Sequence, residues 1–302
     1  MSAMFHLWCR WVAARRRPIV LGPFRSELGF EVLYWLPWLH HLRTTYKWPK
    51  ERIIVIGRGG SGRWYEAGQV TDLYDYLPLT DARLLLHQQS SQHVSVNQYH
   101  TVQADREIAR YVTARLGVRR YHWVAPTVMY DALAPWWKDQ MSVNTLGRQT
   151  RYQERLAVPP PPAELQLPQE FIAAKFYSRG TFVMDEPTLG FIKARVRELA
   201  TQMPVVLLNC DLFTDDHADV PITGENILRV PPNLLTPSTH LAVLASILSK
   251  AKFFIGTYGG FAQLALRCGV PAVSFYSQFA GTALAHKALS DMLAVRMGIP
   301  WL

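Results

Sequence analysis

A short stretch near the C-terminus has the residue types and spacing to bind phosphate. Residues 253–255 (Phe-Phe-Ile) predict a buried strand, and residues 256–260 read Gly-Thr-Tyr-Gly-Gly. A helix is expected over residues 261–268 and a second buried strand over residues 271–276. Free N–H groups at a helix N-terminus attract phosphate, and ligands of parallel α/β sheets lie beyond the carboxyl ends of the strands. Alternatively, the glycines only form a turn between two core elements. The candidate phosphate-binding residues are Thr257, Tyr258, Gly259, Gly260 and Gln263.

The same pattern of strand, glycine and basic residue occurs twice in the N-terminal half. Residues 18–22 (PIVLG) predict a strand that runs into GPFRSELGFE at residues 22–31, and RIIVIG predicts another strand that runs into RGGSGRW. Apolar residues recur every three or four positions over residues 28–42, which predicts a helix with Ser26 as its N-cap and a bend at Pro37. Strands that alternate with helices indicate a parallel sheet.

The C-terminal half repeats this alternation behind a proline-rich segment. Strands are expected over residues 170–177, 204–208 and 226–230, and helices over residues 187–200 and from Thr236 onward. Four consecutive prolines at residues 159–162, followed by Pro168, favour a stiff, extended linker. We therefore expect an α/β chain with two doubly wound Rossmann-like domains that face each other across a cleft. The expected parts are residues 1–17, a basic and aromatic N-terminal segment; 18–158, the first domain; 159–168, the linker; and 169–302, the second domain.

Composition restricts the class of protein without naming a partner. The 302 residues are 49% hydrophobic and 18% charged, as in a folded chain, and no apolar run is long enough to span a membrane. The net charge of +9 favours anionic partners but does not distinguish nucleotides, lipid head groups, anionic polysaccharide and nucleic acid. The separated cysteines Cys9, Cys210 and Cys268 suggest neither disulfides nor a zinc site, which fits a reducing cytoplasm. Aromatic residues before Arg15, Arg16 and Arg17 could lie at a membrane surface, or the segment could simply pack.

Polar residues follow the strands predicted for the second domain. Tyr177, Ser178 and Arg179 follow the first of these strands, and Asn209 and Asp211 follow the second. An acidic patch at residues 214–219 contains Asp215, Asp216 and His217. This patch could bind a divalent metal, contact a ribose, base or acceptor, or form a plain loop. No GxSxG, HExxH, Walker A or GxGxxG pattern is present, which disfavours hydrolases, metalloproteases and P-loop kinases.

Three stretches resemble a known family. FIGTYGGFAQLALRCGVPAVSFY, FIAAKFYSRG and GPFRSELGFE are similar to segments of two-domain, metal-independent glycosyltransferases of the GT-B type, such as heptosyltransferases and O-fucosyltransferases. The resemblance implies transfer of a sugar from a nucleotide-sugar co-substrate to a cell-surface glycan or lipid-linked acceptor. It implies no further cofactor, no metal and no nucleic-acid partner. A cytoplasmic enzyme, with membrane contact through residues 1–17, would fit polysaccharide biosynthesis for the cell envelope.

The resemblance also implies roles for residues of the second domain. Backbone N–H groups of Gly259, Gly260 and Phe261 would hold the diphosphate, and Thr257 would add a hydroxyl. Arg179 would offset the charge that develops on the leaving diphosphate, with Lys175 as the alternative cation. The remaining candidates for contact with the donor nucleotide are Tyr177, Asn209, Asp211 and His217.

A transferase also needs a base for the acceptor hydroxyl, and the first domain offers carboxylates for it. We expect Glu27 to be this base, with Glu31 in reserve, although Glu27 in a first helical turn could serve only helix stability. Arg25 could bind an anionic acceptor or a phosphate, while Gly22 and Gly29 fit a loop that approaches a ligand. Two alternatives stay open: a nucleotide-sugar epimerase of the same fold, and a non-enzymatic binder of anionic polymer.

Overall fold

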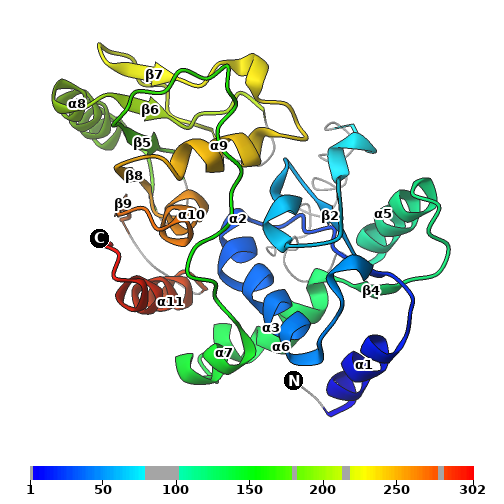
Figure 1. The fold of residues 1–302 in the computed structure, drawn as a ribbon. Helices are drawn as coiled ribbons and strands as arrows, with labels where there is room; N and C mark the ends of the chain where they lie inside the picture. Colours follow the sequence, from blue (N-terminus) through cyan, green and yellow to red (C-terminus); the bar gives the residue numbers. More distant parts are fainter. Residues whose placement is uncertain (1–2, 79–101, 179–181, 213–217, 278–281) are drawn as a thin grey trace. The chain divides into compact units, whose positions relative to one another are not determined.

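The computed structural model describes residues 3–78, 102–178, 182–212, 218–277 and 282–302 (Figure 1). Within it the chain divides into two units, Met1–Gln153 and Glu154–Leu302. Each unit is built on its own parallel sheet. Residues 159–168, the expected linker, contain neither helix nor strand and belong to the second unit.

The sheet of the first unit has the strand order β3-β2-β1-β4, and all its neighbouring strands are parallel. Every residue of β1 and β2 is buried, as expected for a parallel sheet that is covered on both faces. Val20, Ile54 and Ile56 pack against Ile108 and Val112 of helix α5. The strands are β1 (Ile19–Leu21), β2 (Ile53–Gly57), β3 (Gln69–Asp72) and β4 (His122–Val124). The helices are α1 (Ala3–Ala14), α2 (Leu28–Phe30), α3 (Leu36–Tyr46), α5 (Val102–Arg115), α6 (Pro126–Trp137) and α7 (Val143–Gln149), with 3-10 turns at Lys50–Arg52, Ser61–Tyr65 and Leu73–Asp75.

The helix that follows β1 is interrupted by a π-helical stretch, Glu31–Trp35, between α2 and α3. Pro37 has no N–H to donate to the carbonyl of Leu33, and a local π-helical adjustment is one way in which a helix accommodates such a residue. The Leu33 carbonyl accepts a hydrogen bond from the Tyr152 hydroxyl at 2.7 Å. The expected irregularity near Pro37 is therefore present as a π-helix. The N-cap position is occupied by Glu27, one residue later than expected.

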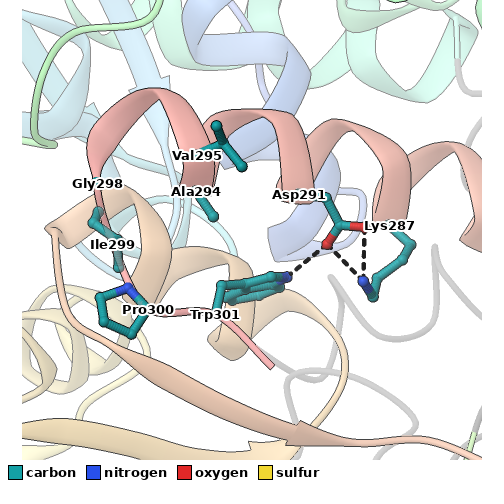
Figure 2. Close-up of a pocket in the computed structure, with 8 residues that line it drawn as sticks. All are labelled: Lys287, Asp291, Ala294, Val295, Gly298, Ile299, Pro300 and Trp301. Carbon is teal, nitrogen blue, oxygen red and sulfur yellow. Dashed lines mark hydrogen bonds and ion pairs between the residues drawn. The ribbon is translucent and has the colours of Figure 1, made fainter.

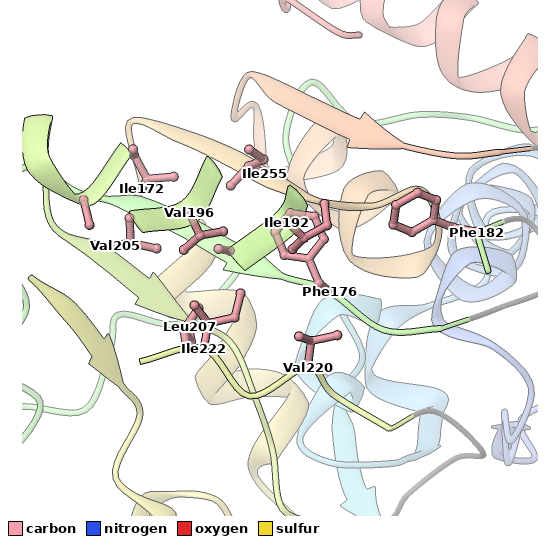
Figure 3. Packing of buried hydrophobic residues seen from close by; sticks show 12 residues of the cluster. Ile172, Phe176, Phe182, Ile192, Val196, Val205, Leu207, Val220, Ile222 and Ile255 are labelled. Atoms are coloured by element: carbon pink, nitrogen blue, oxygen red, sulfur yellow. The ribbon is translucent and has the colours of Figure 1, made fainter. Parts of the chain in front are cut away.

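The second unit has the strand order β7-β6-β5-β8-β9, again with every neighbouring pair parallel. If the strands are renumbered from the first strand of each unit, the order is 3-2-1-4 in the first unit and 3-2-1-4-5 in the second. This is the strand order of a doubly wound fold. Figure 3 shows the apolar cluster in which Ile172, Leu207 and Ile255 pack with Ile192 and Val196 of helix α8. The strands are β5 (Ile172–Lys175), β6 (Val205–Leu207), β7 (Ile227–Arg229), β8 (Phe253–Thr257) and β9 (Ala272–Phe275). The helices are α8 (Glu186–Gln202), α9 (His240–Leu248), α10 (Gly260–Cys268) and α11 (Thr282–Met297), with a 3-10 turn at Pro232–Leu234.

Helix α9 begins at His240, four residues after the start expected at Thr236. The Thr236 and Thr239 hydroxyls are 2.7 Å apart, and the Thr236 N–H donates to the Thr239 hydroxyl. These hydrogen bonds form a turn before the helix, where the sequence pattern suggested the helix itself. Among the described residues, no helix combines the length and the apolarity that crossing a membrane requires.

Candidate functional site

The loops that follow β5 and β8 lie side by side at the point where the strand order of the second sheet reverses. The two strands are paired in parallel, with Lys175 opposite Gly256. Just beyond this pair, the Tyr177 N–H donates to the Thr257 hydroxyl at 3.1 Å, and this hydroxyl donates to the Tyr177 carbonyl at 2.9 Å. Ligands of doubly wound sheets bind at this switch point. The structure therefore brings Tyr177 and Thr257 together at the place where a ligand is expected.

The Thr257 side chain faces the inside of the protein. The residue is 0% exposed, and its hydroxyl already makes two hydrogen bonds with the Tyr177 backbone. This differs from the expectation that the hydroxyl contacts a phosphate, because a phosphate cannot reach a hydroxyl enclosed in this way. Thr257 instead fixes the distance between the two loops.

Gly259 and Gly260 form the start of helix α10, and both are partly exposed. Gly259 occupies the N-cap position with extended backbone and provides no side-chain cap for the N–H groups of the first turn. A Cβ atom at Gly259 would lie 2.1 Å from the Tyr177 hydroxyl oxygen, so the close approach of Tyr177 requires glycine there. Gly259 and Gly260 thus keep part of the helix N-terminus exposed, and amide groups at such a position suit an anion.

Tyr258 and Gln263 lie behind this helix start, with exposures of 4% and 2%. The Tyr258 ring contacts those of Tyr276 and Trp301. Burial raises the pKa of Tyr258 to about 12, so the phenol stays protonated at neutral pH. Of the candidate phosphate-binding residues, Gly259 and Gly260 are accessible, whereas Tyr258 and Gln263 support them from within the fold.

Lys175 ends strand β5 in a buried ion pair. Its Nζ donates to Asp219 Oδ2 at 2.7 Å and to the Leu208 carbonyl at 3.0 Å, and it lies 4.8 Å from the centre of the Phe261 ring. Asp219 Oδ2 also accepts the Cys210 N–H at 2.8 Å. Lys175 thus neutralises Asp219 and supports the first turn of α10, whereas we expected it to be an alternative cation for the leaving group. Sequence reasoning missed Asp219, although it is the last acidic residue of the patch at residues 214–219.

The remaining candidates of the second unit are dispersed. Asn209 is buried and donates from Nδ2 to the Val220 carbonyl at 2.9 Å. The Asp211 side chain is 71% exposed and pairs with Arg229 at 3.3 Å. The other candidates of this unit, Arg179, Asp215, Asp216 and His217, lie outside the described residues.

In the first unit, Glu27 is exposed at the N-cap position of α2 and makes no capping hydrogen bond through its side chain. Gly29 is buried in the same short helix. Gly22 has a φ of +92°, and a Cβ atom there would lie 2.7 Å from the Ile56 carbonyl oxygen. This glycine is required by packing between strand ends, whereas we expected it to allow the approach of a ligand.

Glu31, the expected reserve base, is enclosed. It is 0% exposed, and its carboxylate accepts hydrogen bonds from the Ser61 hydroxyl at 2.9 Å and the Tyr65 hydroxyl at 2.6 Å. Arg58 Nη2 lies 3.5 Å from its other oxygen. Burial and the Glu31 charge hold the pKa of Tyr65 well above its ordinary value. Glu31 therefore anchors the loop after β2 and has no path to an acceptor, which leaves Glu27 as the accessible carboxylate of the pair.

Arg25 is held in a buried ion pair, with Nε 2.7 Å from Asp105 Oδ1. Its side chain is 7% exposed, and Nη1 and Nη2 have no hydrogen-bond partner within the described residues. The Asp105 carboxylate thus offsets the Arg25 charge, while the two nitrogens without a partner are themselves buried. Binding of an anion by Arg25 stays a prediction.

A shallow pocket of about 500 Å³ lies between helix α11 and the residues that follow it (Figure 2). Lys287 Nζ pairs with Asp291 at 2.6 Å, and Trp301 Nε1 donates to the same carboxylate at 3.1 Å. The pocket is not lined by any residue of the α10 start, and its rim residue Val295 is 85% exposed. We assign the candidate ligand site to the α10 start instead.

No protein-family model and no curated protein matches the sequence. Solved structures that are similar to this chain include E. coli ADP-heptose LPS heptosyltransferase II, with 13% identity, a TM-score of 0.46, and coverage of 87% of this chain and 86% of that one. A glycosyl transferase family 9 protein of Veillonella parvula has 12% identity, a TM-score of 0.45, and coverage of 87% and 82%. The iron-containing dodecameric glycosyltransferase TibC of enterotoxigenic E. coli has 12% identity and a TM-score of 0.44; 85% of this chain is covered but only 57% of TibC. The solved structures that are similar to this chain are thus glycosyltransferases. Because these TM-scores are below 0.5, a functional assignment has to be argued from the residues of this chain.

Proposed function

We propose that this protein is a glycosyltransferase that moves a sugar from a nucleotide-activated donor to a glycan or lipid-linked acceptor without a metal ion. One observation carries the proposal. A helix start with two accessible glycines and no side-chain cap lies at the switch point of a doubly wound sheet. Nucleotide phosphates bind at such positions in other α/β proteins.

In the proposed reaction, the amide groups at the α10 start hold the diphosphate of the donor. They are positioned by Thr257, which links the loops after β5 and β8, and by Lys175, which lies against Phe261. As the bond between sugar and phosphate breaks, negative charge grows on the leaving diphosphate, and fixed amide dipoles stabilise it. We assign Arg179 the role of an additional positive charge for this step.

The acceptor is activated from the first unit. Glu27 is proposed to accept the proton of the acceptor hydroxyl as the hydroxyl oxygen attacks the anomeric carbon of the sugar. The accessibility of Glu27 and the enclosure of Glu31 support this choice. We propose that Arg25 binds an anionic group of the acceptor when Nη1 and Nη2, which are buried and have no hydrogen-bond partner among the described residues, become exposed.

Incubation with labelled nucleotide sugars, with and without extracts of cell-envelope glycolipid, tests the reaction class. A transferase releases nucleoside diphosphate and labels the acceptor only when both substrates are present. Conversion of the labelled donor to a second sugar nucleotide without an acceptor would show an epimerase instead. Binding of nucleic acid that weakens steeply with salt, without any nucleotide preference, would favour the anionic-polymer binder.

A further inference from the structure

Helix α1 packs on the first unit with one of its faces. Cys9 and Val12 are 0% exposed, and the Cys9 carbonyl accepts a hydrogen bond from Trp48 Nε1 at 3.2 Å. The Phe5 ring stacks on the Trp38 ring of α3 with 5.9 Å between their centres. Residues 3–14 are therefore a fixed part of the fold rather than a frayed end (Figure 1).

The C-terminal end of α1 is also fixed. Arg52 Nη2 donates to the carbonyls of Val12 at 2.9 Å and Arg17 at 2.8 Å, and Arg52 Nη1 donates to the carbonyl of Ala13 at 3.1 Å. A guanidinium at this position satisfies carbonyls that a helix end leaves free, and its charge suits the negative end of the helix dipole. These contacts determine which face of α1 points outward.

That outward face is apolar. Met4 is 80% exposed, Leu7 is 64% exposed and Trp11 is 44% exposed. Their spacing of three and four residues places them along one side of the helix. Large hydrophobic side chains gathered on an exposed helix face indicate an interaction surface.

The surroundings of this face are strongly basic. Arg10, Arg15, Arg16 and Arg17 are all exposed, and no acidic residue precedes Glu27 in the sequence. The Arg15 guanidinium lies 5.2 Å from the centre of the Trp11 ring. The positive charges also act on the neighbouring ring: burial, followed by the charges of Arg17, Arg52 and Arg15, lowers the pKa of His122, which contacts Trp11. The apolar face is thus bordered by a concentrated positive field.

We propose that α1 binds the surface of an anionic lipid bilayer, with Met4, Leu7 and Trp11 in the interfacial region and the arginines against phosphate head groups. A basic helix with an aliphatic and aromatic face binds anionic membranes through both buried apolar area and charge. A second copy of the chain would bring two basic clusters together, and nucleic acid would leave the apolar face without a partner. This membrane contact goes beyond the proposed sugar transfer and does not depend on it.

Flotation with vesicles tests the apolar contribution. The full chain is expected to float with vesicles of phosphatidylglycerol and phosphatidylcholine and to remain behind with pure phosphatidylcholine. Leu7→Ser and Met4→Ser are each expected to weaken this binding severalfold, because each removes exposed apolar area that the bilayer would bury. The matched control is Val295→Ser in the second unit, a similarly exposed site that should leave binding unchanged.

Flotation of arginine variants tests the electrostatic contribution. Because each arginine near an anionic membrane contributes about 1 kcal/mol, replacing Arg15, Arg16 and Arg17 with glutamine should weaken binding by roughly fivefold per residue and reduce its salt dependence. The control removes the same charge from exposed arginines of the second unit, Arg195, Arg197 and Arg296, and should bind almost like the parent. The substituted side chains are exposed, so thermal unfolding should show intact folds. Absence of flotation, equal losses in test and control variants, or preferential binding of RNA would each overturn the proposal. None of these outcomes would bear on nucleotide binding by the second unit, which is measured separately.

Discussion

The Tyr177 hydroxyl oxygen occupies the space in which residue 259 would carry its Cβ atom. An added Cβ would lie 2.1 Å from this oxygen but 3.4 Å from the ring carbon that bears it. The conflict is therefore with one atom of Tyr177, and a glycine at position 259 lets the loop after β5 lie against the start of α10. This contact connects the two loops that we assign to donor binding.

Gly259→Ala is expected to destabilise the second unit, by about 1–3 kcal/mol for this kind of overpacking. In the background of Tyr177→Phe, the same substitution should cost much less, because the remaining 3.4 Å distance is an ordinary contact. Thermal unfolding of the parent, the two single variants and the double variant measures the coupling. An equal loss in both backgrounds would show that the hydroxyl is not the obstacle.

Lys175→Met is expected to destabilise the protein by about 3–5 kcal/mol, because it leaves Asp219 buried without its partner. The Lys175 and Asp219 side chains are 9% and 14% exposed. The double variant Lys175→Met, Asp219→Asn should lose less, since no unpaired charge remains. Urea denaturation compares the two. If Lys175→Met alone is as stable as the double variant, or more stable, this account of the ion pair is wrong.

Asp72 should make the stability of the first unit depend on pH. Burial raises its pKa from an ordinary 3.8 to about 6, although the N–H groups of Gly60 and Tyr74 donate to its carboxylate. Between about pH 4 and pH 6, the folded state binds more protons at this carboxyl than the unfolded state does, so its contribution to stability falls as pH rises. The total change is at most about 3 kcal/mol, from 1.36 kcal/mol per pKa unit.

The variant Asp72→Asn isolates this effect. The free energy of unfolding of the parent, minus that of the variant, is expected to fall from pH 4 to pH 6. The exposed Asp139→Asn serves as the control for the loss of one carboxylate. A difference for Asp72→Asn that does not fall between pH 4 and pH 6, or that falls equally in the control, would refute the raised pKa.

Glu27→Gln is expected to leave donor binding intact and to lower turnover by about 10²–10⁴-fold, because the amide cannot accept the acceptor proton. Glu31→Gln should mainly reduce stability, since its carboxylate accepts from Ser61 and Tyr65. Glu51→Gln, at another exposed carboxylate of the first unit, is the control. Steady-state kinetics together with thermal unfolding separate these results. Full turnover in Glu27→Gln would place the base elsewhere.

Local patterns in the sequence predict much of the fold. Short apolar runs that end in glycine predicted β1, β2 and β8, and β5, β6 and α10 were expected close to their observed positions. The predicted start of α9 was wrong, because hydrogen bonds between Thr236 and Thr239 form a turn before the helix begins at His240. Helix α11 was not predicted.

The candidate site was predicted less completely, because long-range partners determine where side chains point. Thr257 and Tyr177 are separated by 80 residues, and Lys175 and Asp219 by 44. Nothing in the local sequence around Thr257 or Lys175 shows that these partners satisfy their polar groups. The sequence therefore predicts the glycine-led helix start, whereas only the structure separates its accessible residues from the enclosed ones.

Calorimetric titration with a panel of nucleoside diphosphates tests most directly whether the α10 start binds a sugar donor through its phosphates. We predict that one nucleoside diphosphate binds with one-to-one stoichiometry, that Gly260→Val and Arg179→Ala abolish or strongly weaken this binding while the fold stays intact, and that Glu27→Gln preserves it. Absence of binding by every member of the panel, or unchanged binding by Gly260→Val, would contradict the assignment.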